Sequence, residues 1–239
     1  MPKKVNNWRL LSDNKSIRGL CDFLTDRRMP RVTDLCRDLA ERFQFEESKV
    51  LGYSRVLREA GMLTTGARGV NAPDATSLDA ARLLIVMMVR AKKEDAADAA
   101  TLFGGFVPLA DASIAGKEVA SFEGALSTLI DYCGSVEWDA SAPEERFLDF
   151  DFAASILRDI AVADVSLERI EDGEKREFRF VHPSIAKTSP DGDEVPEEWL
   201  HAMRQYRTGF HEVPSLYKRD LLAIGQVLAG WLEPGGELQ

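Results

Sequence analysis

Hydrophobic residues in the first third of the chain recur at helical spacing in three short segments. The first segment carries one apolar stripe that ends before Pro30, formed by Ile17, Leu20, Cys21 and Leu24. The second begins after Pro30 with Thr33 as the expected N-cap, and its apolar side holds Leu35, Cys36, Leu39, Ala40 and Phe43. The third opens at residues 46–48, ends at Gly61 and carries Val50, Tyr53, Val56, Leu57 and Ala60. Three short helices of this kind predict a small orthogonal bundle.

Further helices are predicted beyond a turn-rich connector at residues 66–77. Thr76 and Asp79 have the spacing of a capping box, and the helix they open is apolar on most faces up to Arg90, as in the hub of a domain or a dimer contact. Helices are also predicted over residues 94–103 and 122–133. Residues 183–197 are predicted to form a polar loop, and an amphipathic helix of about 17 residues is expected between residues 214 and 234.

The hydrophobic period changes to that of strands after residue 135. Four β-prone segments follow, at residues 136–138, 147–152, 165–170 and 177–181. The Asp172-Gly173 dipeptide between the last two is a strong hairpin signal. A meander of three or four antiparallel strands is the simplest interpretation, with Leu148, Phe150 and Phe152 on one face and Phe147, Asp149 and Asp151 on the other.

The charge of the chain is divided unevenly along its length. The formal net charge of the 239 residues is -10, but residues 1–70 carry 14 Lys+Arg against 9 Asp+Glu, whereas residues 71–239 carry 16 against 31. A basic first third (net +5) is therefore joined to an acidic remainder (net -15). This division predicts that the N-terminal part binds a polyanion and that the rest has another role.

The third helix has the chemistry that binding to nucleic acid requires. Lys49, Gly52, Arg55 and Arg58 recur at three-residue steps, which provides cations for phosphates and base edges and a small residue where the backbone comes close. After Gly61 comes a short β-prone segment and then a Gly-Ala-Arg-Gly tip around Arg68. An arginine on such a loop is placed to contact phosphate or the minor groove.

Part of the N-terminal third resembles the helix-turn-helix and wing of bacterial winged-helix regulators, and the resemblance is carried by residues 39–43, 49–50 and 54–63. The resemblance covers about residues 15–70. It implies that Ala40 lies where the two helices cross, that Val50 anchors the recognition helix and that Gly61 turns the chain into a wing strand. Two positions depart from the family pattern: Gln44 stands where the turn normally has a glycine, and Gly52 weakens the middle of the recognition helix by ~1 kcal/mol relative to alanine.

These patterns predict an α+β protein of two parts. Residues 1–75 are expected to form a three-helix winged helix-turn-helix, and residues 76–239 an acidic domain with a helical hub, a small antiparallel sheet and a C-terminal helix. The hypothesis is a sequence-specific DNA-binding protein, a bacterial or phage transcriptional regulator that pairs as a homodimer. Ser48, Lys49, Gly52 and Arg55 would read the major groove, while Arg58 and Arg68 would contact phosphate or the minor groove.

Two other functions fit the same charge map. In the first, a phage-encoded adaptor or inhibitor would act on a protein machine, with the acidic part mimicking nucleic acid. In the second, a DNA binder resembling a small terminase would take part in packaging. Acidic clusters such as Glu144-Glu145 and residues 191–194 would matter most to the first of these.

Catalytic and metal-binding motifs are absent from the sequence. Cys21, Cys36 and Cys133 have no zinc or redox spacing and are expected to be buried reduced thiols, and the three histidines show no paired-ligand spacing. Asp149 and Asp151 lack the neighbouring Glu-x-Lys of a metal-dependent nuclease. We therefore expect neither enzymatic activity nor a cofactor. The longest uncharged apolar run, residues 83–89, is too short to span a bilayer, and a cytoplasmic location is expected.

Overall fold

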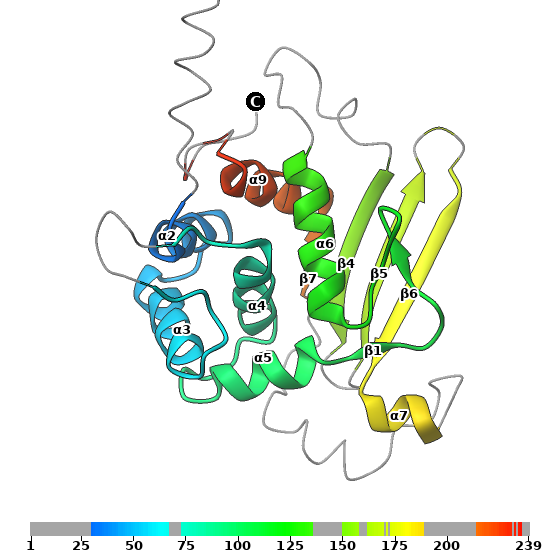
Figure 1. The fold of residues 1–239 in the computed structure, drawn as a ribbon, viewed down its shortest axis with the longest axis horizontal. Helices are drawn as coiled ribbons and strands as arrows, with labels where there is room; N and C mark the ends of the chain where they lie inside the picture. The colour runs from blue at the N-terminus through cyan, green and yellow to red at the C-terminus, as the bar shows by residue number, and fades with distance from the viewer. Residues whose placement is uncertain are drawn as a thin grey trace, which may run out of the picture.

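The structure is a computed structural model that describes residues 30–66, 73–135, 150–157, 162–169, 171, 173–188, 214–230, 232 and 234–235. The first predicted helix, the strand predicted at residues 136–138, Cys21 and Arg68 lie outside these residues. In the described part, a group of helices lies beside an antiparallel sheet (Figure 1). This arrangement confirms the α+β class.

The described helices follow the apolar periodicity closely. They are α2 (Val32–Arg42), α3 (Glu47–Glu59), α4 (Ser77–Met88), α5 (Ala96–Gly104), α6 (Phe122–Ser135), α7 (Pro183–Thr188) and α9 (Lys218–Leu228). Thr33 was predicted as the N-cap of α2, but the N-cap is Arg31, two residues earlier, and Thr33 lies inside the helix. The Asp34 side chain in the first turn accepts a hydrogen bond of 3.3 Å from the Arg31 backbone N–H, so an acidic residue inside the helix completes this end.

The sheet has five strands in the order β1-β6-β5-β4-β7, all antiparallel. Its strands are β1 (Val107–Pro108), β4 (Phe150–Leu157), β5 (Val162–Arg169), β6 (Lys175–Val181) and β7 (Ser215–Tyr217), and β2 (Ser113–Ile114) and β3 (Lys117–Glu118) form a separate hairpin. The predicted meander is confirmed as β4-β5-β6. At the β5–β6 turn, Gly173 has a φ of 70°, and the Arg169 N–H donates to the Glu174 carbonyl at 2.9 Å.

Three sequence-based boundaries are wrong. The strand predicted over residues 147–152 is β4 and extends to Leu157. Residues 183–188 form α7 rather than a loop, while the rest of the predicted loop lies outside the described residues. The predicted C-terminal helix of ~17 residues is an 11-residue α9 preceded by β7, because Leu216 is buried as a strand residue paired with Ala154.

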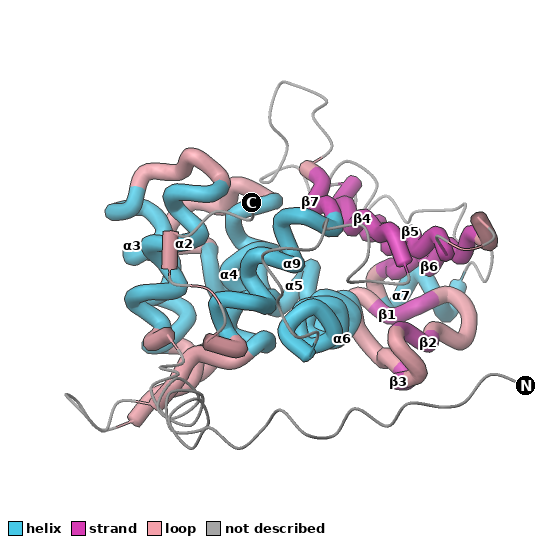
Figure 2. Tube along the Cα trace, turned by 90° about the horizontal axis from the view of Figure 1, so that it is seen from above, coloured by secondary structure: helices cyan, strands magenta, loops and turns pink. Residues whose placement is uncertain are grey.

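One face of the sheet packs on the helices and the other faces away from them. Figure 2 shows α6 and the β2–β3 hairpin on the same side of the sheet. On β4, Phe152, Ala154 and Ile156 are buried whereas Asp151 is exposed, as the alternation predicted. The side chain of Phe150 and all of residues 147–149 lie outside the described part.

Helix α4 is the hub of the helical group. Its N-terminus has the predicted capping box, in which the Asp79 backbone N–H donates to the Thr76 hydroxyl at 3.1 Å and the Thr76 N–H donates to the Asp79 carboxylate at 2.8 Å. Its buried residues occupy almost every side of the helix: 79–81 and 83–88. The helix lies between the α2–α3 pair and α6 (Figure 1), so its all-round apolar surface is used within the chain.

Buried contacts cross residue 75, where a domain boundary was predicted. One hydrophobic cluster runs from Val32 in α2 to Leu228 in α9. The Thr64 N–H donates to the Asp79 carboxylate at 2.8 Å, and the Gly235 N–H donates to Asp38 on α2, also at 2.8 Å. Helices α2 and α3 therefore share their core with the elements that follow, and the two-domain division remains a prediction.

The two described cysteines are free and buried. Burial raises the pKa of the Cys36 thiol to about 11 and that of Cys133 to about 12, so both are protonated at neutral pH. No group of three or more His, Cys, Asp or Glu side chains gathers as metal ligands within the described part of the chain. Among the same residues, no helix has the length and apolar character needed to cross a membrane.

Candidate nucleic-acid interface

Helices α2 and α3 form the unit on which the predicted interface depends. Leu35 and Leu39 of α2 and Val50, Tyr53 and Leu57 of α3 are fully buried. These residues recur on one side of each helix, so burial of the apolar sides leaves the opposite half of α3 exposed. Ala40, predicted to lie where the helices cross, is 3% exposed.

The turn between the two helices is a Schellman motif. The Phe45 N–H donates to the Ala40 carbonyl at 2.8 Å, and the Gln44 N–H donates to the Glu41 carbonyl at 3.2 Å. Gln44 has a φ of 53°, a left-handed conformation that favours glycine. The position at which the sequence departs from the family pattern therefore has the backbone conformation that a glycine would adopt without strain.

Replacing Gln44 with glycine is expected to stabilise the protein. The left-handed conformation costs a residue with a side chain roughly 1–2 kcal/mol. Part of this gain is offset because glycine also makes the unfolded chain more flexible, which costs about 0.4–1 kcal/mol. The expected net gain is roughly 0.5–1 kcal/mol in the free energy of unfolding, measured by urea titration. A midpoint that does not rise would contradict this interpretation of the turn.

The structure brings four of the six predicted site residues together on α3. Ser48, Lys49, Arg55 and Arg58 are exposed, whereas Gly52 is buried and Arg68 lies outside the described residues. Three residues turn an α-helix by 300°, so each three-residue step moves about 60° backwards around the axis. Lys49 and Arg58 are therefore about 180° apart around the helix axis. The cations are spread across the exposed half of α3 and do not form one line.

Lys93 from the α4–α5 loop covers Gly52. A Cβ built on Gly52 would lie 3.2 Å from both Cδ and Cε of Lys93. The loop is held there because the Tyr53 hydroxyl donates to the Ala91 carbonyl at 2.6 Å. The backbone does come close to another group at Gly52, as predicted, but that group is a lysine of the same chain. DNA approaching this face would meet Lys93 before Gly52.

The α4–α5 loop is the part of the candidate interface that sequence reasoning missed. It carries Arg90, Lys92 and Lys93 within four residues directly after the buried helix α4. That run of cations was the available signal. Its proximity to α3 could not be read from the sequence because it depends on the Tyr53–Ala91 hydrogen bond and on the packing of Lys93 on Gly52.

Several polar side chains of α3 have partners within the chain. The Ser48 hydroxyl bonds to the Glu46 carboxylate. Arg55 Nε donates to Glu59 at 2.8 Å, and this hydrogen bond raises the pKa of the Arg55 guanidinium. Both members of the Arg55–Glu59 pair are more than half exposed, so the pair is weak enough for an anionic ligand to replace Glu59.

Unlike Ser48 and Arg55, the two lysines on this face, Lys49 and Lys93, have no carboxylate partner among the described residues. Lys49 Nζ lies 5.8 Å from the ring centroids of both Phe45 and Tyr53, which orients the ammonium without neutralising it. Within the described ranges, neither Lys49 nor Lys93 lies within ion-pair distance of a carboxylate. Lys93 packs on Gly52, and Lys49 lies three residues before it on α3. Both ammonium groups can donate hydrogen bonds to a phosphate.

The charges in residues 30–66 balance. This segment has six cations and six anions: Arg31, Arg37, Arg42, Lys49, Arg55 and Arg58 against Asp34, Asp38, Glu41, Glu46, Glu47 and Glu59. The net +5 of residues 1–70 therefore comes from residues 1–29 and Arg68. Within the described part of the chain, the basic character near α3 depends on which cations lack partners and on the neighbouring loop.

The predicted wing strand does not form in the described residues after α3. Residues 62–66 have no strand pairing. Instead, Arg31 and Asp74 form an antiparallel bridge, and the Ala75 N–H donates to the Pro30 carbonyl at 2.8 Å. The chain that leaves α3 thus returns to the start of α2 at residues 74–75, and residues 67–72, with the predicted tip at Arg68, lie outside the described residues.

The second carboxylate considered for metal binding has a local role. Asp151 Oδ1 accepts a 3.1 Å hydrogen bond from the Phe152 N–H, and its neighbour Asp149 lies outside the described residues.

Comparison with protein-family models, curated proteins and solved structures gives no match for this chain.

Proposed function

We propose that the chain binds double-stranded DNA through the exposed half of α3 and the adjoining α4–α5 loop. The observation that carries the proposal is the pair of lysines at Gly52: Lys49 is held over two aromatic rings and Lys93 packs on the glycine, each without a carboxylate partner in the described residues. Arg55 and Arg58 extend the same exposed surface. Exposed cations on one helix and the adjoining loop are suited to contact phosphates along a groove edge.

The helix-turn-helix resemblance gives this surface its role. α3 follows α2 through a tight turn, and a recognition helix in that position places its exposed side chains in the major groove. Ser48 and Arg55 face outward on nearly the same side of α3, since seven residues make almost two full turns. We propose these two as base contacts, with Lys49, Arg58, Lys93 and Arg68 as phosphate contacts.

The proposed role is that of a cytoplasmic transcriptional regulator of bacterial or phage type. One helix-turn-helix contacts few base pairs, so pairing of two chains would supply the affinity that a specific site needs. The acidic residues 76–239 would be repelled by DNA, apart from the α4–α5 loop, and would supply the dimer contact or bind a protein partner.

The first test measures binding of the full chain to a labelled random-sequence duplex. Fluorescence anisotropy reports the affinity at salt concentrations between 25 and 200 mM. Four to five phosphate contacts predict that log K falls with log salt with a slope of about -4, because each contact releases condensed counterions. Failure to bind duplex DNA at low salt would overturn the proposal. Selection from a random duplex library should then enrich a site with two-fold symmetry, which tests specificity and pairing separately.

A further inference from the structure

A cavity lies between α6, the β2–β3 hairpin and the inner face of the sheet, away from α3. Its volume is about 280 Å³. The lining is mostly apolar and comes from all three elements: Ser113, Ile114, Ala115, Gly116, Leu129, Tyr132, Phe152, Leu167 and Arg176. Both views show the hairpin next to α6 on the same side of the sheet (Figures 1 and 2).

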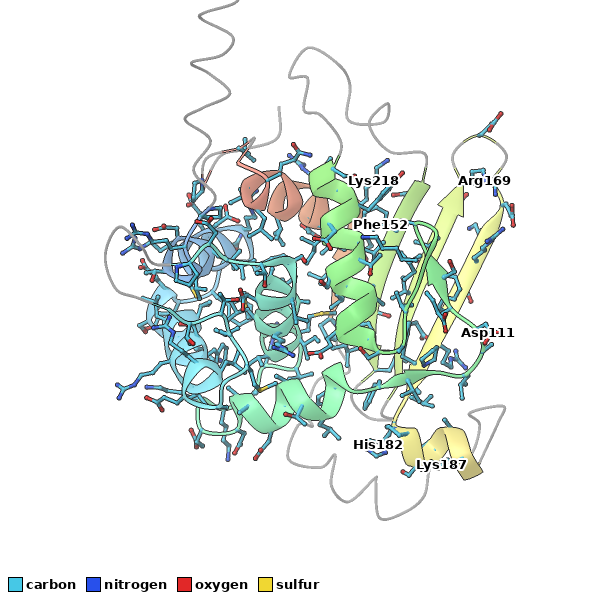
Figure 3. All side chains as sticks on the ribbon, in the orientation of Figure 1. Asp111, Phe152, Arg169, His182, Lys187 and Lys218 are labelled. Atoms are coloured by element: carbon cyan, nitrogen blue, oxygen red, sulfur yellow. The ribbon has the colours of Figure 1, made fainter. Side chains whose placement is uncertain are left out.

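The floor of the cavity is one row of side chains across three strands. Phe152 of β4 is paired with Leu167 of β5, which is paired with Arg176 of β6. Residues directly opposite each other in an antiparallel sheet point to the same face. Phe152 and Leu167 are buried on the face that α6 covers, and Figure 3 labels Phe152 on β4 beside that helix. Arg176 is therefore a cation at the rim of the apolar face of the sheet, with 57% of its side chain exposed.

Arg176 retains hydrogen-bonding capacity. Its Nε and Nη2 atoms both donate to Oε1 of Glu174, at 3.1 and 3.0 Å. A guanidinium has five N–H donors, so three remain, and none of them bonds to a described residue. An apolar cavity with one available guanidinium at its edge is complementary to a molecule with an apolar body and an anionic end.

We propose that this cavity binds a small amphipathic monocarboxylate. The apolar body would pack against Leu129, Tyr132 and Phe152, and the carboxylate would accept hydrogen bonds from Arg176. The volume equals about nine waters at ~30 Å³ each, which suits a body of about that many non-hydrogen atoms. Glu174 bridges two guanidiniums, with Oε1 bonded to Arg176 at 3.0 Å and Oε2 bonded to Arg169 at 2.9 Å. One further negative charge balances this group of two arginines and one glutamate, so a monoanion is favoured over a dianion such as a phosphate monoester.

An arginine on the inner face of an edge strand has a second explanation, which the test must distinguish from ligand binding. β1 pairs with Phe180 and Val181 of β6, and the Leu109 N–H donates to the Arg179 carbonyl at 2.9 Å, which leaves residues 175–178 as an edge in the described part of the sheet. Charged residues that point inward on an edge strand prevent pairing with other chains. If edge protection were the only role of Arg176, a carboxylate with an apolar body would not bind to Arg176 and the cavity together.

Octanoate is the probe, titrated into the full chain by isothermal calorimetry, with 1-octanol as its uncharged counterpart. We expect octanoate to bind with Kd on the order of 0.1 mM. Arg176→Gln should weaken octanoate about tenfold and leave 1-octanol unchanged. Arg179→Gln is the matched control, because Arg179 lies on the outer face of the same strand, paired with Asp164 at 3.1 Å. It should leave octanoate binding unchanged.

A second variant tests the cavity itself. Ser113 is exposed at its edge, so Ser113→Trp should block the opening without disturbing the core and should abolish binding of both probes. Absence of octanoate binding, equal binding by wild type and Arg176→Gln, or full binding by Ser113→Trp would each overturn the proposal. The inference does not rest on DNA binding and can be tested without it.

Discussion

Replacing Gly225 with alanine is expected to destabilise the protein by roughly 3 kcal/mol, although the same change in a solvent-exposed helix stabilises by about 1 kcal/mol. Gly225 lies where α9 crosses α6. A Cβ built there would lie 2.6 Å from the Ile130 carbonyl oxygen, 2.7 Å from the Cys133 Cβ and 2.7 Å from the Gly134 nitrogen. Two of these atoms belong to the backbone, so the helices would have to move apart.

Such a movement would also strain the contact on the other side of the crossing. A Cβ on Gly134 would lie 2.8 Å from the Gly225 carbonyl oxygen, and the neighbouring Gln226 amide donates to the Cys133 carbonyl at 2.6 Å. The free energy of unfolding from urea titration measures the effect. Gly124→Ala, also in α6, is the control because its Cβ would meet only the Ser121 hydroxyl, at 3.2 Å. Equal stability of the two variants would contradict close backbone contact at the crossing.

Replacing Asp79 with alanine is expected to cost about 3 kcal/mol. The carboxylate is 2% exposed. It accepts three hydrogen bonds of 2.8 Å, from the Thr64 N–H, the Thr76 N–H and the Thr76 hydroxyl. Alanine would leave two backbone N–H groups without their acceptor, and each charge-assisted bond of this kind contributes roughly 1.5–3 kcal/mol.

The matched control for Asp79 is the exposed Asp98, in the first turn of α5. Asp98→Ala should cost under ~0.5 kcal/mol, because only the interaction with the helix dipole is lost. Asp79→Asn should fall between the two alanine variants, since its amide oxygen still accepts one hydrogen bond. An Asp79→Ala variant as stable as Asp98→Ala would show that the segment after α3 is not held by this carboxylate.

Local sequence signals predicted the elements that local chemistry determines. Helix α4 follows from the Thr76–Asp79 capping box and its continuous apolar stretch, and the β5–β6 hairpin follows from Asp172-Gly173. Strands β1 and β7 could not be predicted in this way. They are two and three residues long, and their extended conformation depends on pairing with strands that are distant in sequence. Leu216 shows the ambiguity, because it lies 11 residues before Val227, which is close to three full helical turns.

The candidate site was only partly predictable for the same reason. Exposure of Ser48, Lys49, Arg55 and Arg58 follows from the periodicity of α3. The covering of Gly52 by Lys93 is a tertiary contact between residues 41 positions apart and has no local signature. The charge division pointed to the N-terminal third, but it did not show that residues 30–66 are neutral or that Lys93, the cation packed on Gly52, comes from the loop after α4.

The most direct measurement of the central claim is the DNA affinity of the Lys49→Gln/Arg58→Gln/Lys93→Gln variant. The control is Lys117→Gln/Lys175→Gln, which removes cations from β3 and β6. Loss of three phosphate contacts should weaken binding by ten- to a hundredfold at low salt and make the slope of log K against log salt shallower by about 3, while the control binds like wild type. Wild-type affinity and slope in the triple variant would contradict an interface at α3 and the α4–α5 loop.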